Sequence, residues 1–76
     1  MKVNLPLLKS WCEQQFSPMA WQRISLHAYE QLKDKYSLKE LQTPEPDMTL
    51  EGNDLAVVCD AIRELYKVEV PLNDFS

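Results

Sequence analysis

The side chains that could serve as nucleophile, base or metal ligand are few and widely spaced. Cys12 and Cys59 are far apart with no C-x-x-C spacing, and His27 is the only histidine. A structural zinc site needs about four ligands, and nucleophilic catalysis needs a base within reach of the nucleophile. We therefore predict no metal site and no catalytic group, and we expect both cysteines to act as small buried hydrophobes.

Size and glycine content also argue against enzymatic chemistry. With 76 residues the chain forms one domain, and so small a domain rarely encloses a small-molecule pocket of several hundred cubic ångströms. The single glycine is incompatible with a glycine-rich phosphate loop. The sequence predicts a protein that is not an enzyme.

One stretch, LEGNDLAVVCDAIRELYKVEVP, raises the question of a covalently attached cofactor. Its Gly52–Leu55 segment resembles the G-x-D-S-L motif of acyl carrier proteins, whose serine carries a phosphopantetheine arm. The serine is missing here, and only one helix follows, whereas the family has two more. A carrier-like protein without its serine is a remote alternative; the simpler prediction is a glycine turn, an Asn53/Asp54 cap and a helix, with no cofactor.

Apolar spacing predicts the first two helices. Asn4 is a good cap for a helix over residues 5–16, with Pro6 in its first turn. Ser17 and Pro18 have the order typical of the start of a second helix, which we expect to extend to Tyr36. The predicted buried stripes are Leu5, Leu8, Cys12 and Phe16 in the first, and Trp21, Ile24, Ala28, Leu32 and Tyr36 in the second.

A short helix and a long one complete the predicted elements. Ser37 and Glu40 fit a capping box for a short helix over 38–42, and an acidic, proline-containing connector follows over 43–52. The last helix is expected to begin near Asn53 or Asp54, and its predicted buried stripe is Leu55, Val58, Cys59, Ile62, Leu65 and Tyr66.

The resulting fold class is all-α. We predict a single domain over 1–76, a small compact bundle of three main helices plus a short helical turn. The KVEVP segment at 67–71 alternates like a strand and is compatible with a minimal two-stranded pairing of the termini, with KVN at 2–4.

The net charge of −4 is unevenly distributed. Residues 1–39 carry six Lys/Arg and three Asp/Glu, whereas residues 40–76 carry two and nine. This split is either an incidental property of solvated helix surfaces or a dipole that favours charged partners. A helix-turn-helix DNA-binding regulator, with Lys33, Lys35 and Lys39 near phosphates, is an alternative function, but the overall acidity opposes nucleic-acid binding.

The remaining candidate for function is the surface. Met19 and Leu26 lie opposite the buried stripe of the second helix, beside Arg23 and Glu30, where they form a second apolar seam. The alternative is that this helix is central and buries both sides. Trp11 and Trp21 are large for so small a core, and partly buried tryptophans often anchor interfaces.

We therefore expect a non-catalytic protein–protein interaction module: an adaptor, an inhibitor or a subunit of a larger assembly. Its partner is another protein or itself, as a hetero- or homo-oligomer. The N-terminus lacks the features of a secretory signal, and no apolar run reaches the length of a membrane span, so the expected location is the cytoplasm.

Overall fold

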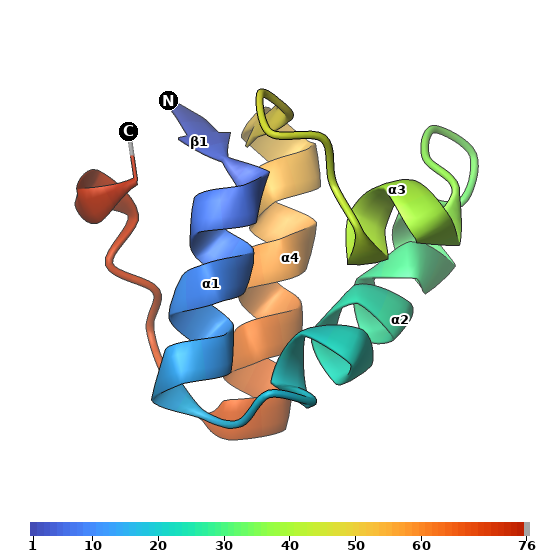
Figure 1. The fold of residues 1–76 in the computed structure, drawn as a ribbon. Coiled ribbons are helices and arrows are strands. Elements are labelled where there is room, and N and C mark those ends of the chain that lie inside the picture. The colour runs from blue at the N-terminus through green and yellow to red at the C-terminus, as the bar shows by residue number, and fades with distance from the viewer. Residues whose placement is uncertain (76) are drawn as a thin grey trace.

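The protein is a small helical domain with a minimal sheet at one end (Figure 1). The computed structural model describes residues 1–75. Their elements in chain order are β1 (Lys2–Asn4), α1 (Leu5–Gln15), α2 (Ala20–Leu32), α3 (Leu38–Gln42), β2 (Thr49–Glu51), α4 (Gly52–Tyr66) and a 3₁₀ turn, η1 (Leu72–Asp74). In Figure 1, α2 and α3 lie to one side of α1 and α4, and the C-terminal segment lies on the other side of α1. The predicted all-α fold of three main helices and one short helix is confirmed.

The two-stranded sheet forms with a different partner from the predicted one. β1 pairs antiparallel with β2, with Val3 opposite Leu50, and not with residues 67–71. Val3 and Leu50 are both buried, so this register places one apolar side chain of each strand in the core. The connector predicted over 43–52 therefore ends in a strand.

A glycine with positive φ joins this strand to α4. Gly52 has φ +59° at the start of the helix, a backbone conformation that residues with a Cβ adopt at a cost. The residue that precedes the helix is Glu51, which makes no side-chain cap. The prediction that Asn53 or Asp54 caps α4 is wrong: the Asp54 carboxylate instead accepts hydrogen bonds from Tyr36 and Lys35.

The predicted helix starts were accurate where a local cap exists. The Asn4 side chain accepts from the backbone N–H of Leu7 at 2.9 Å, and Ser37 and Glu40 form both bonds of the capping box. The second helix differs: it begins at Ala20 after a turn in which the Ser17 carbonyl, not its hydroxyl, accepts from Ala20.

This helix also ends earlier than predicted. α2 stops at Leu32, whose carbonyl accepts from the backbone N–H groups of both Lys35 and Tyr36 as the chain turns toward α3. Tyr36 is consequently half-buried beside the core and not a member of the α2 stripe.

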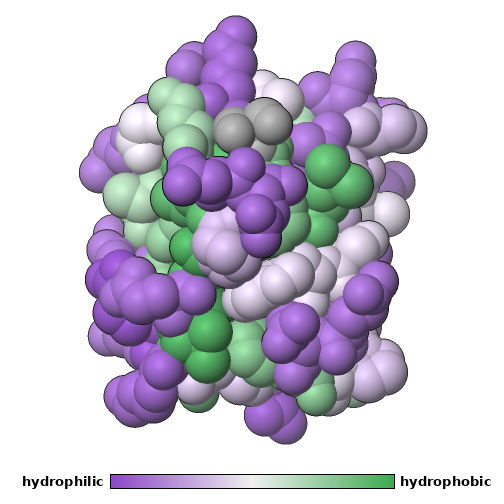
Figure 2. Space-filling view, turned by 90° about the vertical axis from the view of Figure 1, so that its left-hand side faces the viewer, coloured by the Kyte–Doolittle hydropathy of each residue, from purple (hydrophilic) through white to green (hydrophobic). Residues whose placement is uncertain are grey.

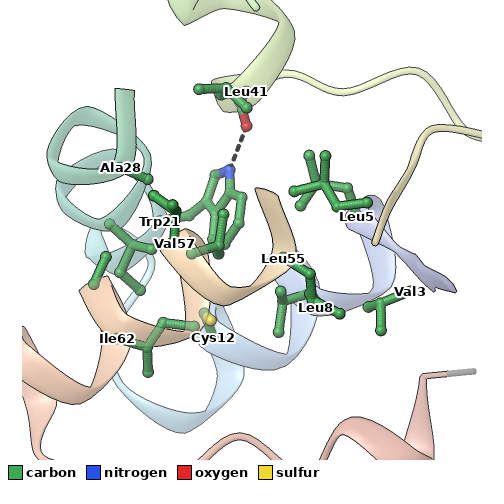
Figure 3. Packing of buried hydrophobic residues seen from close by; sticks show 14 of the residues in the cluster. Val3, Leu5, Leu8, Cys12, Trp21, Ala28, Leu41, Leu55, Val57 and Ile62 are labelled. Atoms are coloured by element: carbon green, nitrogen blue, oxygen red, sulfur yellow. Dashed lines mark hydrogen bonds between the residues drawn. The ribbon is translucent and has the colours of Figure 1, made fainter. Parts of the chain in front are cut away.

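The core contains side chains from both strands and all four α-helices (Figure 3). Its centre includes Trp21, whose indole nitrogen donates to the Leu41 carbonyl at 2.8 Å. The buried apolar residues are Val3, Leu5, Leu8, Cys12, Ala20, Trp21, Ile24, Ala28, Leu32, Leu41, Leu50, Leu55, Val57, Val58, Ala61 and Ile62.

Four residues of α4 depart from their predicted environments. Cys59 and Tyr66, predicted to be buried, are only half-buried against the core. Val57, which lay off the predicted stripe, belongs to the core cluster together with Trp21 and Ala28 of α2. Leu65, predicted to be buried, is 41% exposed. The buried side of α4 is wider than one stripe in its middle, because several elements pack around it, and it ends before the last turn.

The C-terminal segment packs back against α1. Lys67 ends α4 in the left-handed conformation (φ 59°), and the chain then passes along α1 toward the end of the molecule that holds β1 (Figure 1). The Phe75 ring meets Trp11 edge to face, with 6.0 Å between ring centroids. On this side of the molecule, hydrophobic surface is broken up by hydrophilic residues (Figure 2).

Candidate protein-binding surface

Three of the six predicted contact residues line one open groove. Arg23, Leu26 and Glu30 of α2 meet Leu65 of α4 there, together with His27. We call this groove, which has a volume of about 380 Å³, the α2–α4 groove. Because its members come from two helices, the second apolar seam predicted from α2 alone is part of a wider surface.

Helical spacing explains why the α2 residues share one side. Positions 23, 26, 27 and 30 follow the i, i+3, i+4, i+7 pattern, while Ile24 and Ala28 point into the core. Leu26 is 54% exposed. The alternative that α2 is buried on both sides is therefore wrong at this position.

A polar contact joins the two sides of the groove. His27 Nε2 lies 2.7 Å from Glu64 Oε2, and both side chains are exposed. This hydrogen bond links α2 to the last turns of α4, at the residue that precedes Leu65.

His27 and Leu65 were missed as members of this surface. His27 shares a helix side with Arg23, Leu26 and Glu30, but its partner Glu64 is 37 residues away in the sequence. Leu65 follows the α4 stripe in its spacing, so only its place in the final turn signals exposure.

Among the described residues, the side chains of Arg23 and Glu30 on α2 are unpaired, whereas Arg63 near the end of α4 is paired. Neither side chain forms an ion pair or hydrogen bond with any residue in the range 1–75. By contrast, Arg63 binds the Glu69 carboxylate through two nitrogens and also contacts Asp60. The hydrogen bonds from Arg63 lower the pKa of Glu69 and, in return, raise the pKa of Arg63.

The other three predicted contact residues lie outside the groove lining. Trp21 is only 2% exposed and hydrogen-bonded within the core, so its prediction as an interface anchor is wrong. Trp11 is half-buried and packs edge to face against Phe16 and Phe75. Met19 is 55% exposed directly before α2 and stays a predicted contact residue.

The two thiols are poorly suited to chemistry. Burial raises the pKa of Cys12 to about 12, and nearby Cys59 and Glu13 add to this shift. Burial also raises the pKa of Cys59. Since the thiolate is the reactive form, both cysteines are protonated and weakly nucleophilic at neutral pH.

A second open groove, of about 420 Å³, lies beside α3 and the connector. Its lining residues are Tyr36, Lys39, Glu40, Thr43, Glu45, Asp47 and Met48. One of the three lysines proposed to contact DNA, Lys35, donates to Asp54 at 3.1 Å. The helix that would enter the groove of DNA, α3, has only five residues.

Metal-ligating clusters and long apolar helices are both absent from the described part of the chain. Within residues 1–75 there is no group of three or more His, Cys, Asp or Glu side chains that could hold a metal ion. Among the described helices, none has the length and apolar character required to cross a membrane.

No family model, no curated protein sequence and no solved structure matches this chain.

Proposed function

We propose that the protein is a small, non-catalytic, cytoplasmic interaction module that binds a protein partner through the α2–α4 groove. The observation that carries this proposal is the meeting of two exposed leucines from different helices. Leu26 and Leu65 line the same groove, and both are among the large apolar side chains that stay exposed.

Such an arrangement has a physical cost in the isolated chain. A domain of this size already buries only about 60% of the surface that its unfolded chain exposes, so leaving two leucines together in water forfeits stabilisation. Apolar surface rimmed by polar groups is typical of interaction sites. Here Arg23, Glu30 and the His27–Glu64 pair supply the polar rim.

The test compares two leucines with equal exposure. Leu26 and Leu7 are each 54% exposed, but Leu7 lies on α1, outside the groove lining. Tagged wild type, Leu26→Asp and Leu7→Asp would be used to capture partners from the native source, with the helical circular dichroism of each variant recorded.

We expect Leu26→Asp to lose the captured partner and Leu7→Asp to keep it, with all three proteins equally helical. Capture that survives Leu26→Asp, or that is lost equally in both variants, would contradict a role for the α2–α4 groove.

A further inference from the structure

The charges that rim the α2–α4 groove are arranged in a self-complementary way. Arg23 and Glu30 are seven residues apart, about 10 Å along the helix, and Leu26 lies between them. Both are exposed, and neither has an ion-pair partner in the part of the chain that the structure describes. A surface with one charge of each sign on either side of an apolar centre can match a copy of itself.

We propose that the partner of the α2–α4 groove is a second copy of this chain, bound so that the two α2 helices pack antiparallel about a two-fold axis. This inference rests on the proposed function and names the partner of the same site. The axis passes between Leu26 and His27, so Leu26 lies level with His27 of the partner subunit and one residue away from Leu26 of the partner subunit. Leu65 lies at the flank of this contact.

The antiparallel arrangement follows from the sequence positions. When the axis crosses between residues 26 and 27, Arg23 lies opposite Glu30 of the partner subunit, and Glu30 lies opposite Arg23 of the partner subunit. Gln22 then lies opposite Gln31 of the partner subunit, so exposed amides also face each other. A parallel pairing would instead place Arg23 against Arg23 of the partner subunit, and like charges at an interface are unfavourable.

The size of the surface predicts a weak dimer. A standard interface takes about 800 Å² from each partner, a large share of the 4791 Å² accessible surface of this chain. The α2–α4 groove is lined by only five residues, far fewer than the roughly 20–30 residues that each partner contributes to a standard interface. The exposed Arg–Glu pairs contribute modestly and are screened by salt, so association should appear at high concentration and weaken as salt is added.

The experiment is sedimentation equilibrium on Arg23→Glu, Glu30→Arg, their equimolar mixture and the double variant. Each single variant places like charges opposite each other twice in its homodimer, and we expect about tenfold weaker self-association. In the mixture, one variant is acidic at both positions and the other is basic at both. Opposite charges therefore meet at both sites of the mixed dimer, which should associate at least as well as wild type. The double variant should also recover association.

Matched charge changes away from the groove serve as controls. Lys39→Glu and Glu45→Arg reverse exposed charges of the same signs near α3 and the connector, and we expect each to self-associate like wild type. A wild type that stays monomeric up to about 1 mM, a mixture that stays monomeric, or variants that associate unchanged would each overturn the antiparallel dimer.

The dimer and the proposed function fail in different ways. If wild type is monomeric while Leu26→Asp still abolishes capture of another protein, the groove is an interaction site for a different partner and the self-association is wrong. If wild type self-associates equally with and without Leu26→Asp, the dimer through this groove is contradicted, and the capture experiment alone decides whether the groove binds another protein.

Discussion

The indole nitrogen of Trp21 donates a hydrogen bond to the carbonyl oxygen of Leu41 across 2.8 Å, and both residues are buried. This bond links α2 to the short helix α3 and satisfies a carbonyl at the end of a helix of only five residues. Tryptophan is common at interfaces because it combines an apolar ring system with one polar N–H. In Trp21 both parts make their contacts inside the molecule (Figure 3).

Trp21→Phe should therefore be strongly destabilising. The substitution removes the donor, leaves the Leu41 carbonyl without its partner and opens a small cavity, at a combined cost of about 3 kcal/mol in the free energy of unfolding. Urea unfolding followed by far-ultraviolet circular dichroism measures this cost. Trp11→Phe is the control, since Trp11 is half-buried and makes ring contacts; equal costs for both variants would contradict the structural role of Trp21.

The C-terminal segment should protect Trp11 from solvent. Phe75→Ala removes the edge-to-face contact at 6.0 Å, which should cost about 1 kcal/mol in stability and increase the quenching of tryptophan fluorescence by acrylamide. Because Trp21 is buried in the core, the additional quenching reports on Trp11. Asp74→Ala, an exposed neighbour, should leave quenching unchanged; unchanged quenching in Phe75→Ala as well would show that the segment does not cover Trp11.

The features predicted correctly from the sequence are those set by neighbouring residues. The Ser37–Glu40 capping box needs only two side chains three positions apart, and the Asn4 cap is equally local. The start and end of α2 were less accurate, because Ser17 and Tyr36 take part in turns whose hydrogen bonds use backbone atoms. Hydrogen bonds between backbone atoms place few constraints on the side chains at these positions, so the sequence gives little indication of them.

The features that were missed depend on residues far apart in the chain. Alternation alone predicted that residues 2–4 pair with residues 67–71, whereas the buried partner of Val3 is Leu50, in the strand directly before α4. The position of Leu65 within the last turn of α4, beside the His27–Glu64 contact, decides its exposure. The α2 residues of the groove can be recognised in the sequence because their spacing puts them on one side of one helix. The contribution of α4 cannot be recognised in this way, because it depends on how the two helices pack.

Stability should fall in acid through Asp54. Hydrogen bonds from Tyr36 (2.9 Å) and Lys35 (3.1 Å) lower the pKa of this carboxyl in the native state. A carboxyl with a lowered native pKa contributes its full stabilisation above the unfolded pKa of about 3.9, and this is lost as the pH falls through the lower native value.

Asp54→Asn should lower the free energy of unfolding at pH 7 by about 1 kcal/mol and flatten its decline below about pH 4. Thermal unfolding between about pH 7 and pH 2.5, in wild type and variant, tests this. Asp34→Asn is the control, because the exposed Asp34 side chain makes no hydrogen bond or ion pair among the described residues. An identical acid profile for wild type and Asp54→Asn would rule out this carboxylate as a source of the pH dependence.

Glycine should affect stability in opposite ways at the two ends of α4: removing it at position 52 should destabilise the protein, and introducing it at position 67 should stabilise it. Gly52 and Lys67 have the same positive φ of 59°, but only the first residue lacks a Cβ. A Cβ at position 52 would have no atom within 4 Å, so Gly52→Ala should lose about 1 kcal/mol of stability through backbone conformation alone. Gly52→Asn should lose less, because asparagine tolerates the left-handed region. Urea unfolding of both variants measures the difference, and an alanine variant as stable as wild type would contradict it.

Lys67→Gly should gain stability for the same reason. The Lys67 backbone N–H donates to the Arg63 carbonyl and ends the helix, and glycine is the preferred residue at this place. The side chain is exposed and makes no hydrogen bond or ion pair among residues 1–75, so relief of the left-handed strain should outweigh the larger entropy of the unfolded chain and give about 0.5–1 kcal/mol. Lys67→Ala, which keeps a Cβ, should give no gain; equal stabilities of the glycine and alanine variants in urea would mean that the backbone of residue 67 is unstrained.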